Sequence, residues 1–308
     1  MFKGLGKLFL IRPGLLTEEE REFYSDLGFE NFIFFKEHFE GDFESYLNRL
    51  EGSSKRLNLL AVDQEGGRVC RIKGDFESPL DMAKRAEKEG SQVFRAWAEK
   101  IAETLRSYRL NLNLSPVVDR GQEDTPEFLR GRTYGCDPER IIHLASLFIE
   151  EHKKRGLKTC LKHFPGLFEV TLDPHRELPL KKNIYREDLL PFIKLAPKTD
   201  FIMTTHLLAS ELDHNFPVTF SERAIDFLRK ELEFRGGILT DDLSMGALKS
   251  FHLSERIVFS LVSGHNLLIY CGPYGELREA LFECKEEFEK SQILKEKIQE
   301  SLTILGRY

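Results

Sequence analysis

The 308-residue sequence lacks the marks of a secreted or membrane protein. It contains five cysteines, an odd number without any CxxC pair, so neither a disulfide framework nor a zinc or dithiol motif is predicted. The stretch Met1–Gly14 holds one short apolar run, Leu8–Ile11, which is too short for a signal-peptide core or a membrane span. We therefore expect a cytoplasmic protein with no membrane partner.

An excess of positive charge is also missing. The chain has 45 basic and 51 acidic side chains, a formal net charge of −6, which offers no general attraction to nucleic acid or anionic lipid. No Pro/Gly/Ser-rich linker, low-complexity tract or internal repeat divides the chain. With 41% hydrophobic residues it can bury a large core, so we expect one globular domain over residues 1–308, and a monomer.

Short β-rich runs alternate with longer amphipathic segments along the whole chain, which predicts strand followed by helix eight times. The runs are nearly continuous in apolar residues, as is typical of parallel strands covered by helices. We therefore predict an α/β fold, a closed (β/α)8 TIM barrel, with an open doubly wound sheet as the alternative. The runs are Lys7–Arg12, Asn31–Lys36, Leu57–Asp63, Leu110–Asp119, Lys158–Phe164, Phe201–Leu207, Gly237–Asp242 and Asn266–Cys271. The helical segments include Thr17–Leu27, Gln92–Ser107, Pro138–Lys154, Glu222–Leu232, Leu253–Val262 and Glu276–Leu305.

Residues capable of chemistry follow five of these runs. Singly, Asp and Gly after a strand are ordinary turn residues. The carboxyl ends of barrel strands meet at one mouth, so the five groups together predict one active site there. They are Asp63-Gln64-Glu65-Gly66-Gly67-Arg68, Asp119, Lys162-His163-Phe164-Pro165-Gly166, His206 and Asp241-Asp242.

The pair Asp241-Asp242 is the sharpest of these signals. Successive side chains on a strand point to opposite faces, so only one of the two carboxylates can face the mouth, and alternation does not say which. That carboxylate would serve as nucleophile or base. The alternative role, a helix N-cap for a segment beginning at Leu243, suits Asp242 better.

Asp173-Pro174-His175 lies in a polar loop, where a carboxylate beside a histidine can fix its tautomer and raise its basicity. The alternative is a solvated loop histidine without a role. Donors for substrate hydroxyls are available nearby, although either arginine could simply pair with a surface carboxylate. These donors are Lys162, His163, Arg71 and Arg132.

A metal-dependent barrel hydrolase is the rival enzyme class, because several of these residues are of ligand type. No HxH stands on a predicted strand and no HExxH helix is present, so we expect no metal and no cofactor. The residues in question are His163, Asp173, His175, His206 and Asp241.

Four ordered motifs carry a resemblance to a known family. The chain resembles glycoside hydrolase family 3 from about Leu8 to about Gly272, and in particular its bacterial β-N-acetylhexosaminidases, which remove N-acetylglucosamine from muropeptides during cell-wall recycling. The motifs are Val62-Asp63-Gln64-Glu65-Gly66-Gly67-Arg68-Val69, Ser115-Pro116-Val117-Val118-Asp119, Lys162-His163-Phe164-Pro165-Gly166 and Thr240-Asp241-Asp242-Leu243-Ser244-Met245.

The resemblance implies a TIM barrel and a retaining hydrolysis without cofactor. It implies that Asp241 is the nucleophile and that His175, with Asp173, is the acid/base. The substrate contacts that it implies are Asp63, Arg71, Arg132, Lys162 and His163. The alternatives are phosphorolysis of the same glycosides, a β-glucosidase of the same family, and a barrel that binds muropeptide without turnover.

The chain departs from the family pattern near the dyad. The family motif continues His-Gly after Lys-His-Phe-Pro-Gly, whereas Leu167-Phe168 follow here, and Pro174 stands where a small residue is usual. Proline restricts the backbone on both sides of itself, so these changes bear on the mobility of the loop Gly166–Pro179.

Overall fold

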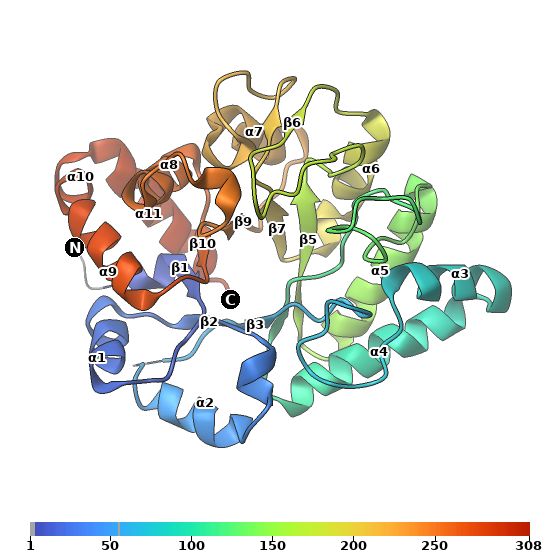
Figure 1. Cartoon of the computed structure of the whole chain (residues 1–308), viewed down its shortest axis with the longest axis horizontal. Helices are drawn as coiled ribbons and strands as arrows, with labels where there is room; N and C mark the ends of the chain where they lie inside the picture. Colours follow the sequence, from blue (N-terminus) through green and yellow to red (C-terminus); the bar gives the residue numbers. More distant parts are fainter. Residues whose placement is uncertain (1–3, 55) are drawn as a thin grey trace.

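A closed barrel of parallel strands forms the centre of the molecule (Figure 1). The computed structural model describes residues 4–54 and 56–308, so the first three residues of the N-terminal stretch considered above lie outside the described residues. Around the barrel the strand order is β1-β10-β9-β7-β5-β4-β3-β2. The barrel strands are β1 Phe9–Ile11, β2 Asn31–Phe34, β3 Leu60–Val62, β4 Leu112–Asn113, β5 Lys158–Phe164, β7 Phe201–Thr204, β9 Gly237–Asp242 and β10 Leu267–Tyr270.

Closure of the sheet confirms the predicted barrel and rules out the open doubly wound alternative. The last strand pairs with the first, with Phe9 opposite Leu268 and Ile11 opposite Tyr270. Helices cover the outer face of the sheet, which explains why the strands are almost wholly buried and read as continuous apolar runs.

Helices surround the strands in Figure 1, and most begin at a side-chain cap. Thr17 accepts the Glu20 N–H, Ser78 accepts the Asp81 N–H and Asp137 accepts the Glu139 N–H, as expected of helix N-caps. The helices are α1 Glu18–Leu27, α2 Phe43–Glu51, α3 Pro79–Glu89, α4 Ser91–Ser107, α5 Pro138–Lys154, α6 Arg186–Leu195, α7 Glu222–Asp226, α8 Leu253–Ser263, α9 Tyr274–Glu283, α10 Lys285–Lys290 and α11 Gln292–Leu305.

Two predicted segments differ most from the structure. Regular strand in the run Leu110–Asp119 is limited to β4, because Pro116 has no N–H to donate to a ladder, although Val118 N–H still bonds to Lys162 O at 2.9 Å. The segment Glu276–Leu305 is three helices instead of one, since the chain turns at Cys284 and Ser291 and the Ser291 side chain caps α11.

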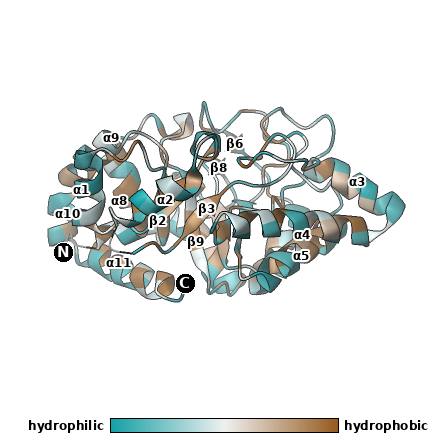
Figure 2. Cartoon of the chain, turned by 90° about the horizontal axis from the view of Figure 1, so that it is seen from below, coloured by the Kyte–Doolittle hydropathy of each residue, from teal (hydrophilic) through white to brown (hydrophobic). Residues whose placement is uncertain are grey.

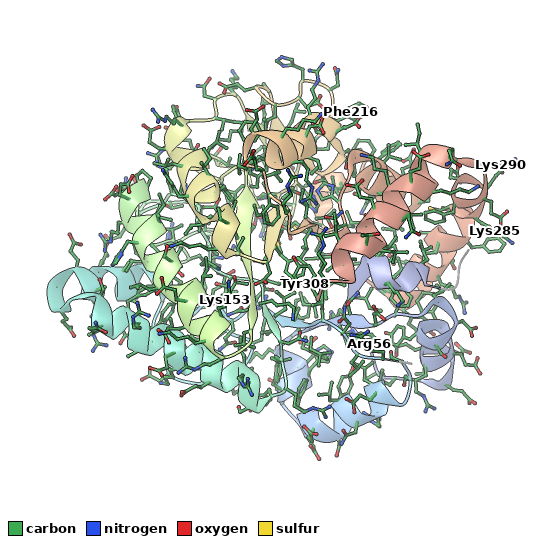
Figure 3. The ribbon with its side chains drawn as sticks, turned by 180° about the vertical axis from the view of Figure 1, so that it is seen from behind. Arg56, Lys153, Phe216, Lys285, Lys290 and Tyr308 are labelled. Atoms are coloured by element: carbon green, nitrogen blue, oxygen red, sulfur yellow. The ribbon has the colours of Figure 1, made fainter. Side chains whose placement is uncertain are left out.

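The two ends of the barrel are built differently. Figure 2 shows the short strands β6 (Leu180–Lys181) and β8 (Leu208–Ala209) on one side and α11 with the C-terminus on the other. On the side where the chain ends, Tyr308 lies near the centre of the view in Figure 3. Its hydroxyl donates to the carbonyl of Asp200, the residue before β7, at 2.8 Å. The end of the chain therefore packs at the amino ends of the strands, and the loops at the carboxyl ends lie on the opposite side of the barrel. No helix among the described residues is long and apolar enough to cross a bilayer.

Candidate active site

A cavity of about 530 Å³ opens at the carboxyl ends of the barrel strands. The eight residues predicted as site residues all lie along its wall, although they come from segments up to 178 positions apart. The wall includes Asp63, Arg71, Arg132, Lys162, His163, Asp173, His175 and Asp241, together with Phe35, Glu65, Arg68, Glu127, Phe128, Arg176, Asp242 and Met245. Asp119 and His206, also noted at strand ends, do not line this cavity and act behind it.

The two carboxylates at the end of β9 have different surroundings. Asp242 accepts hydrogen bonds from Ser244 N–H at 2.9 Å and from Cys271 N–H at 3.0 Å, so its carboxylate ties β9 to the turn after it and to the residue that follows β10. The alternative role considered for Asp242, a helix N-cap, was wrong, because a turn follows β9 and α8 begins only at Leu253. Asp241 accepts only the Asp242 N–H, at 2.8 Å, among the hydrogen bonds found for its carboxylate in the described part of the chain.

His206 lies beneath this strand end and is fully buried. Its Nε2 is 2.9 Å from Asp242 O and its Nδ1 is 2.6 Å from Thr219 Oγ1. Burial lowers the pKa of His206, although the Asp241 carboxylate and the hydrogen bond with Asp242 O partly offset it. Burial raises the pKa of Asp241, but the imidazoles of His206 and His163 and the Asp242 N–H more than offset it, so Asp241 is ionised at neutral pH.

A buried charge cluster forms the opposite wall. Lys162 Nζ lies 2.7 Å from Asp63 Oδ1 and 2.6 Å from Glu65 Oε1, and the Arg132 guanidinium holds Glu65 at 2.7 and 2.8 Å. Burial raises the pKa of Glu65, but these two cations lower it below its usual range. Arg71 completes the wall at 3.5 Å from Asp63. The cluster holds its donors in fixed positions facing the cavity.

His163 is oriented by a carboxylate behind it. Its Nδ1 lies 2.6 Å from Asp119 Oδ2, and the other Asp119 oxygen accepts the Leu167 N–H at 2.8 Å. Its Nε2 is 3.4 Å from an Arg132 nitrogen. Asp119 therefore fixes both the ring of His163 and the first residue after the Lys-His-Phe-Pro-Gly motif.

The dyad Asp173–His175 stands at the rim of the cavity. His175 Nδ1 lies 2.6 Å from Asp173 Oδ1, which also accepts the His175 N–H at 2.9 Å. Partial burial raises the pKa of Asp173, but both hydrogen bonds from His175 lower it below its ordinary value. The His175 side chain is 60% exposed, so its free Nε2 can reach a bound substrate.

Glu65 was named in the strand-end group after β3, but sequence reasoning gave it no role in the site. Its side chain follows Asp63 by two positions, the spacing that places two extended residues on one face, and this signal could have identified it. Arg68 and Arg176 were also missed. Arg68 stands in the motif that follows β3, whereas no pattern marks Arg176, which only the folded loop brings into the cavity wall.

The rival metal site finds no geometric support in the described ranges. Within residues 4–54 and 56–308, no three His, Cys, Asp or Glu side chains are grouped so that they could hold a metal ion. The ligand-type residues are instead paired with other partners, as His163 is with Asp119 and His206 with Thr219.

Comparison with known proteins identifies the family of the chain. The model of the glycosyl hydrolase family 3 N-terminal domain matches residues 31–306. A β-hexosaminidase of Tolumonas auensis is 32% identical over 280 residues, covering 87% of this chain and 83% of that protein. One of Idiomarina loihiensis is 30% identical and covers 83% and 80% of the two chains.

Solved structures show the same fold. A family 3 β-N-acetylglucosaminidase from Paenibacillus superimposes with a TM-score of 0.86 at 25% identity; the match covers 100% of this chain but 61% of the Paenibacillus chain. A β-N-acetylhexosaminidase from Beutenbergia cavernae, at 20% identity and a TM-score of 0.88, shares the fold over 99% of this chain and 97% of its own.

The chain belongs to glycosyl hydrolase family 3, as its motifs implied. Within that family it is a glycoside hydrolase of the β-N-acetylhexosaminidase type.

Proposed function

We propose that this chain is a single-domain, retaining exo-β-N-acetylglucosaminidase that releases terminal β-linked N-acetylglucosamine from muropeptides in peptidoglycan recycling. The observation that carries the proposal is the placement of an ionised Asp241 and the Asp173–His175 dyad along one cavity. The cytoplasmic location and the monomeric state stay predictions from the sequence.

In the first step, a carboxylate oxygen of Asp241 attacks the anomeric carbon and forms a glycosyl ester. Protonated His175 donates its Nε2 proton to the glycosidic oxygen as the bond to the leaving group breaks, so the leaving group departs as a neutral alcohol. Asp173 holds Nδ1–H and thereby stabilises the charged ring.

In the second step, neutral His175 removes a proton from water, and the hydroxide attacks the anomeric carbon to release Asp241 and the sugar with net retention. A histidine suits this role because its basic form is neutral and does not repel the nucleophilic carboxylate. A neutral base also admits an anionic acceptor, so phosphate could take the place of water.

Two arginines on the rim support an anionic leaving group such as a muropeptide. The acid must face the glycosidic oxygen, so the leaving group lies on the His175 side of the cavity. Arg176 follows His175 in the chain, and Arg68, which donates to Glu127 O at 2.5 Å, interacts with Asp173 on the same side. Both guanidinium groups can attract carboxylates of a peptide-bearing aglycone.

The proposal is tested by a matched pair of variants, Asp241→Asn and Asp242→Asn. We expect the first to lower kcat on an aryl N-acetyl-β-glucosaminide by on the order of 10⁴, with an unchanged fold. The second removes a carboxylate that holds a turn, so it should cost about 1–3 kcal/mol of unfolding free energy while turnover persists. Equal loss in both variants would remove Asp241 from its role.

The intermediate and the substrate are tested separately. A fluorinated N-acetylglucosaminyl donor that slows the second step should add the sugar mass to the peptide containing Asp241, and the released sugar should be the β anomer. Faster turnover of the matching β-glucoside would change the assigned substrate to a glucoside. Appearance of sugar 1-phosphate in phosphate buffer would change the assigned reaction from hydrolysis to phosphorolysis. Inertness toward all glycosides would leave a binding barrel.

A further inference from the structure

The loop that carries the dyad is tied together at its base by a buried charge cluster. Asp188, at the start of α6, is 2% exposed and lies 2.8 Å from Lys181 Nζ and 3.2 Å from Arg120 Nη1. Lys181 is on β6, directly after the loop 166–179, and its Nζ also donates to Phe168 O at 2.8 Å. The cluster therefore joins the entry of the loop to its exit.

Phe168 is the side chain through which the loop entry meets this cluster. The Arg120 guanidinium carbon lies 4.1 Å from the centre of the Phe168 ring, a cation–π distance, and the Tyr185 ring contacts the same side chain edge-on. Phe168 stands at one of the positions where the sequence departs from the family motif, which has glycine there. A glycine at position 168 would offer Arg120 no ring.

The tip of the loop has further contacts, with the segment that follows the nucleophile strand. Gly246 N–H donates to His175 O at 3.0 Å, and Ala247 N–H donates to Pro174 O at 3.2 Å. A side chain at position 246 would meet the His175 carbonyl at 2.7 Å, so the close approach requires glycine. The dyad thus bridges the base cluster and the strand end that carries Asp241.

We propose that Phe168, clamped by Arg120 and joined through its carbonyl to the buried Lys181–Asp188 pair, is a positioning residue that holds the loop bearing His175 in the proton-donating geometry. This inference rests on the proposed role of His175 as acid/base. Acid catalysis depends on holding the donor within hydrogen-bond reach of the glycosidic oxygen, and a displacement of about 1 Å can cost about 10²-fold in rate.

The experiment compares two substrates with the same sugar in Phe168→Ala. N,N′-diacetylchitobiose has a leaving group that needs protonation, and 2,4-dinitrophenyl N-acetyl-β-glucosaminide has one that does not. We expect kcat on the disaccharide to fall about 10- to 100-fold, the scale of a misplaced catalytic group. The rate constant of the first step on the aryl substrate, measured in the pre-steady state, should change less than about twofold. Phe168→Tyr keeps the ring under Arg120 and should restore the disaccharide rate.

Hydrogen exchange gives a second readout. Amides 169–177 should exchange faster in Phe168→Ala than in the parent protein and Phe168→Tyr. An equal fall of both rates in Phe168→Ala, or a selective fall without faster exchange, overturns the positioning role. His175→Ala separates the two proposals: it should show the same selectivity for the poor leaving group, and if it does not, the acid/base assignment fails. If it does while Phe168→Ala behaves as the parent, the positioning role alone fails.

Discussion

The carboxylate of Glu65 accepts two hydrogen bonds from the guanidinium of Arg132, at 2.7 and 2.8 Å, inside the barrel mouth. Both side chains are at most 10% exposed, and Lys162 Nζ adds a third contact to the same carboxylate at 2.6 Å. Removing one member of a buried ion pair leaves the other charge without compensation, which typically costs about 3–5 kcal/mol. Glu65 therefore fixes two of the donors that we expect to hold substrate hydroxyls.

We predict that Glu65→Gln lowers the free energy of unfolding by about 3 kcal/mol, because Lys162 and Arg132 lose a shared negative charge. It should also raise KM for the aryl glycoside, since neither donor is then held in place. Urea unfolding and steady-state kinetics measure the two effects. Glu127→Gln is the matched control, because Glu127 lines the same cavity but is exposed. A similar loss in both variants would mean that the Glu65 contacts have no special role.

Much of the fold could be predicted from the sequence, because buried strands and amphipathic helices each have a characteristic spacing of apolar residues. The run Gly237–Asp242 and the segment Pro138–Lys154 match β9 and α5 residue for residue. The helix boundaries at the end of the chain were harder to predict, since Glu276–Leu305 keeps its amphipathic pattern across two turns. Ser291 is the capping residue that could have revealed the second of them.

The site was predictable where its residues sit at strand ends, and less so where partners come from distant segments. Alternation could not choose between Asp241 and Asp242, because the choice depends on the N–H of Cys271, directly after β10, and on the N–H of Ser244, in a turn. The positions of Arg68 and Arg176 depend likewise on loop packing. Arg68 stands in a motif but was not predicted as a site residue, and Arg176 has no local pattern.

We predict that Arg176→Gln changes the choice of leaving group. The kcat/KM for N-acetylglucosaminyl-N-acetylmuramic acid should fall about two- to fivefold, the range of an exposed ion pair, because a cation near the aglycone carboxylate is lost. The kcat/KM for a neutral aryl glycoside should stay within about twofold of the parent. Arg186→Gln, at an exposed arginine outside the cavity wall, serves as control. Equal effects on both substrates in Arg176→Gln would contradict an anionic aglycone site on this rim.

We predict that chelation leaves turnover unchanged. The proposed steps use only Asp241, His175 and Asp173, and none of them needs a Lewis acid. The measurement is the initial rate on the aryl glycoside after dialysis against EDTA, with and without added Zn²⁺ or Mg²⁺. A loss of rate that added metal restores would return the metal-dependent hydrolase as the better assignment.

We predict that stability falls as the pH drops from about 6.5 to about 4, in part because of His152. Burial lowers the pKa of His152 to about 4. Its Nδ1 donates to Phe148 O at 2.9 Å and its Nε2 accepts from Asn113 Nδ2 at 3.1 Å, so a second ring proton would face another donor. Between these pH values the unfolded chain, with an ordinary histidine pKa of about 6.5, binds more protons than the native one, and stability is lost on acidification.

The difference amounts to about 3 kcal/mol for His152 once the pH is below both pKa values. Urea unfolding at pH 7, 5.5 and 4 measures it. His152→Gln keeps a donor and an acceptor but does not titrate, so its stability should depend less steeply on pH, whereas His214→Gln, at an exposed position, should follow the parent curve. Because native His152 stays neutral until about pH 4, an unchanged slope in His152→Gln would show that the buried ring contributes nothing to acid sensitivity.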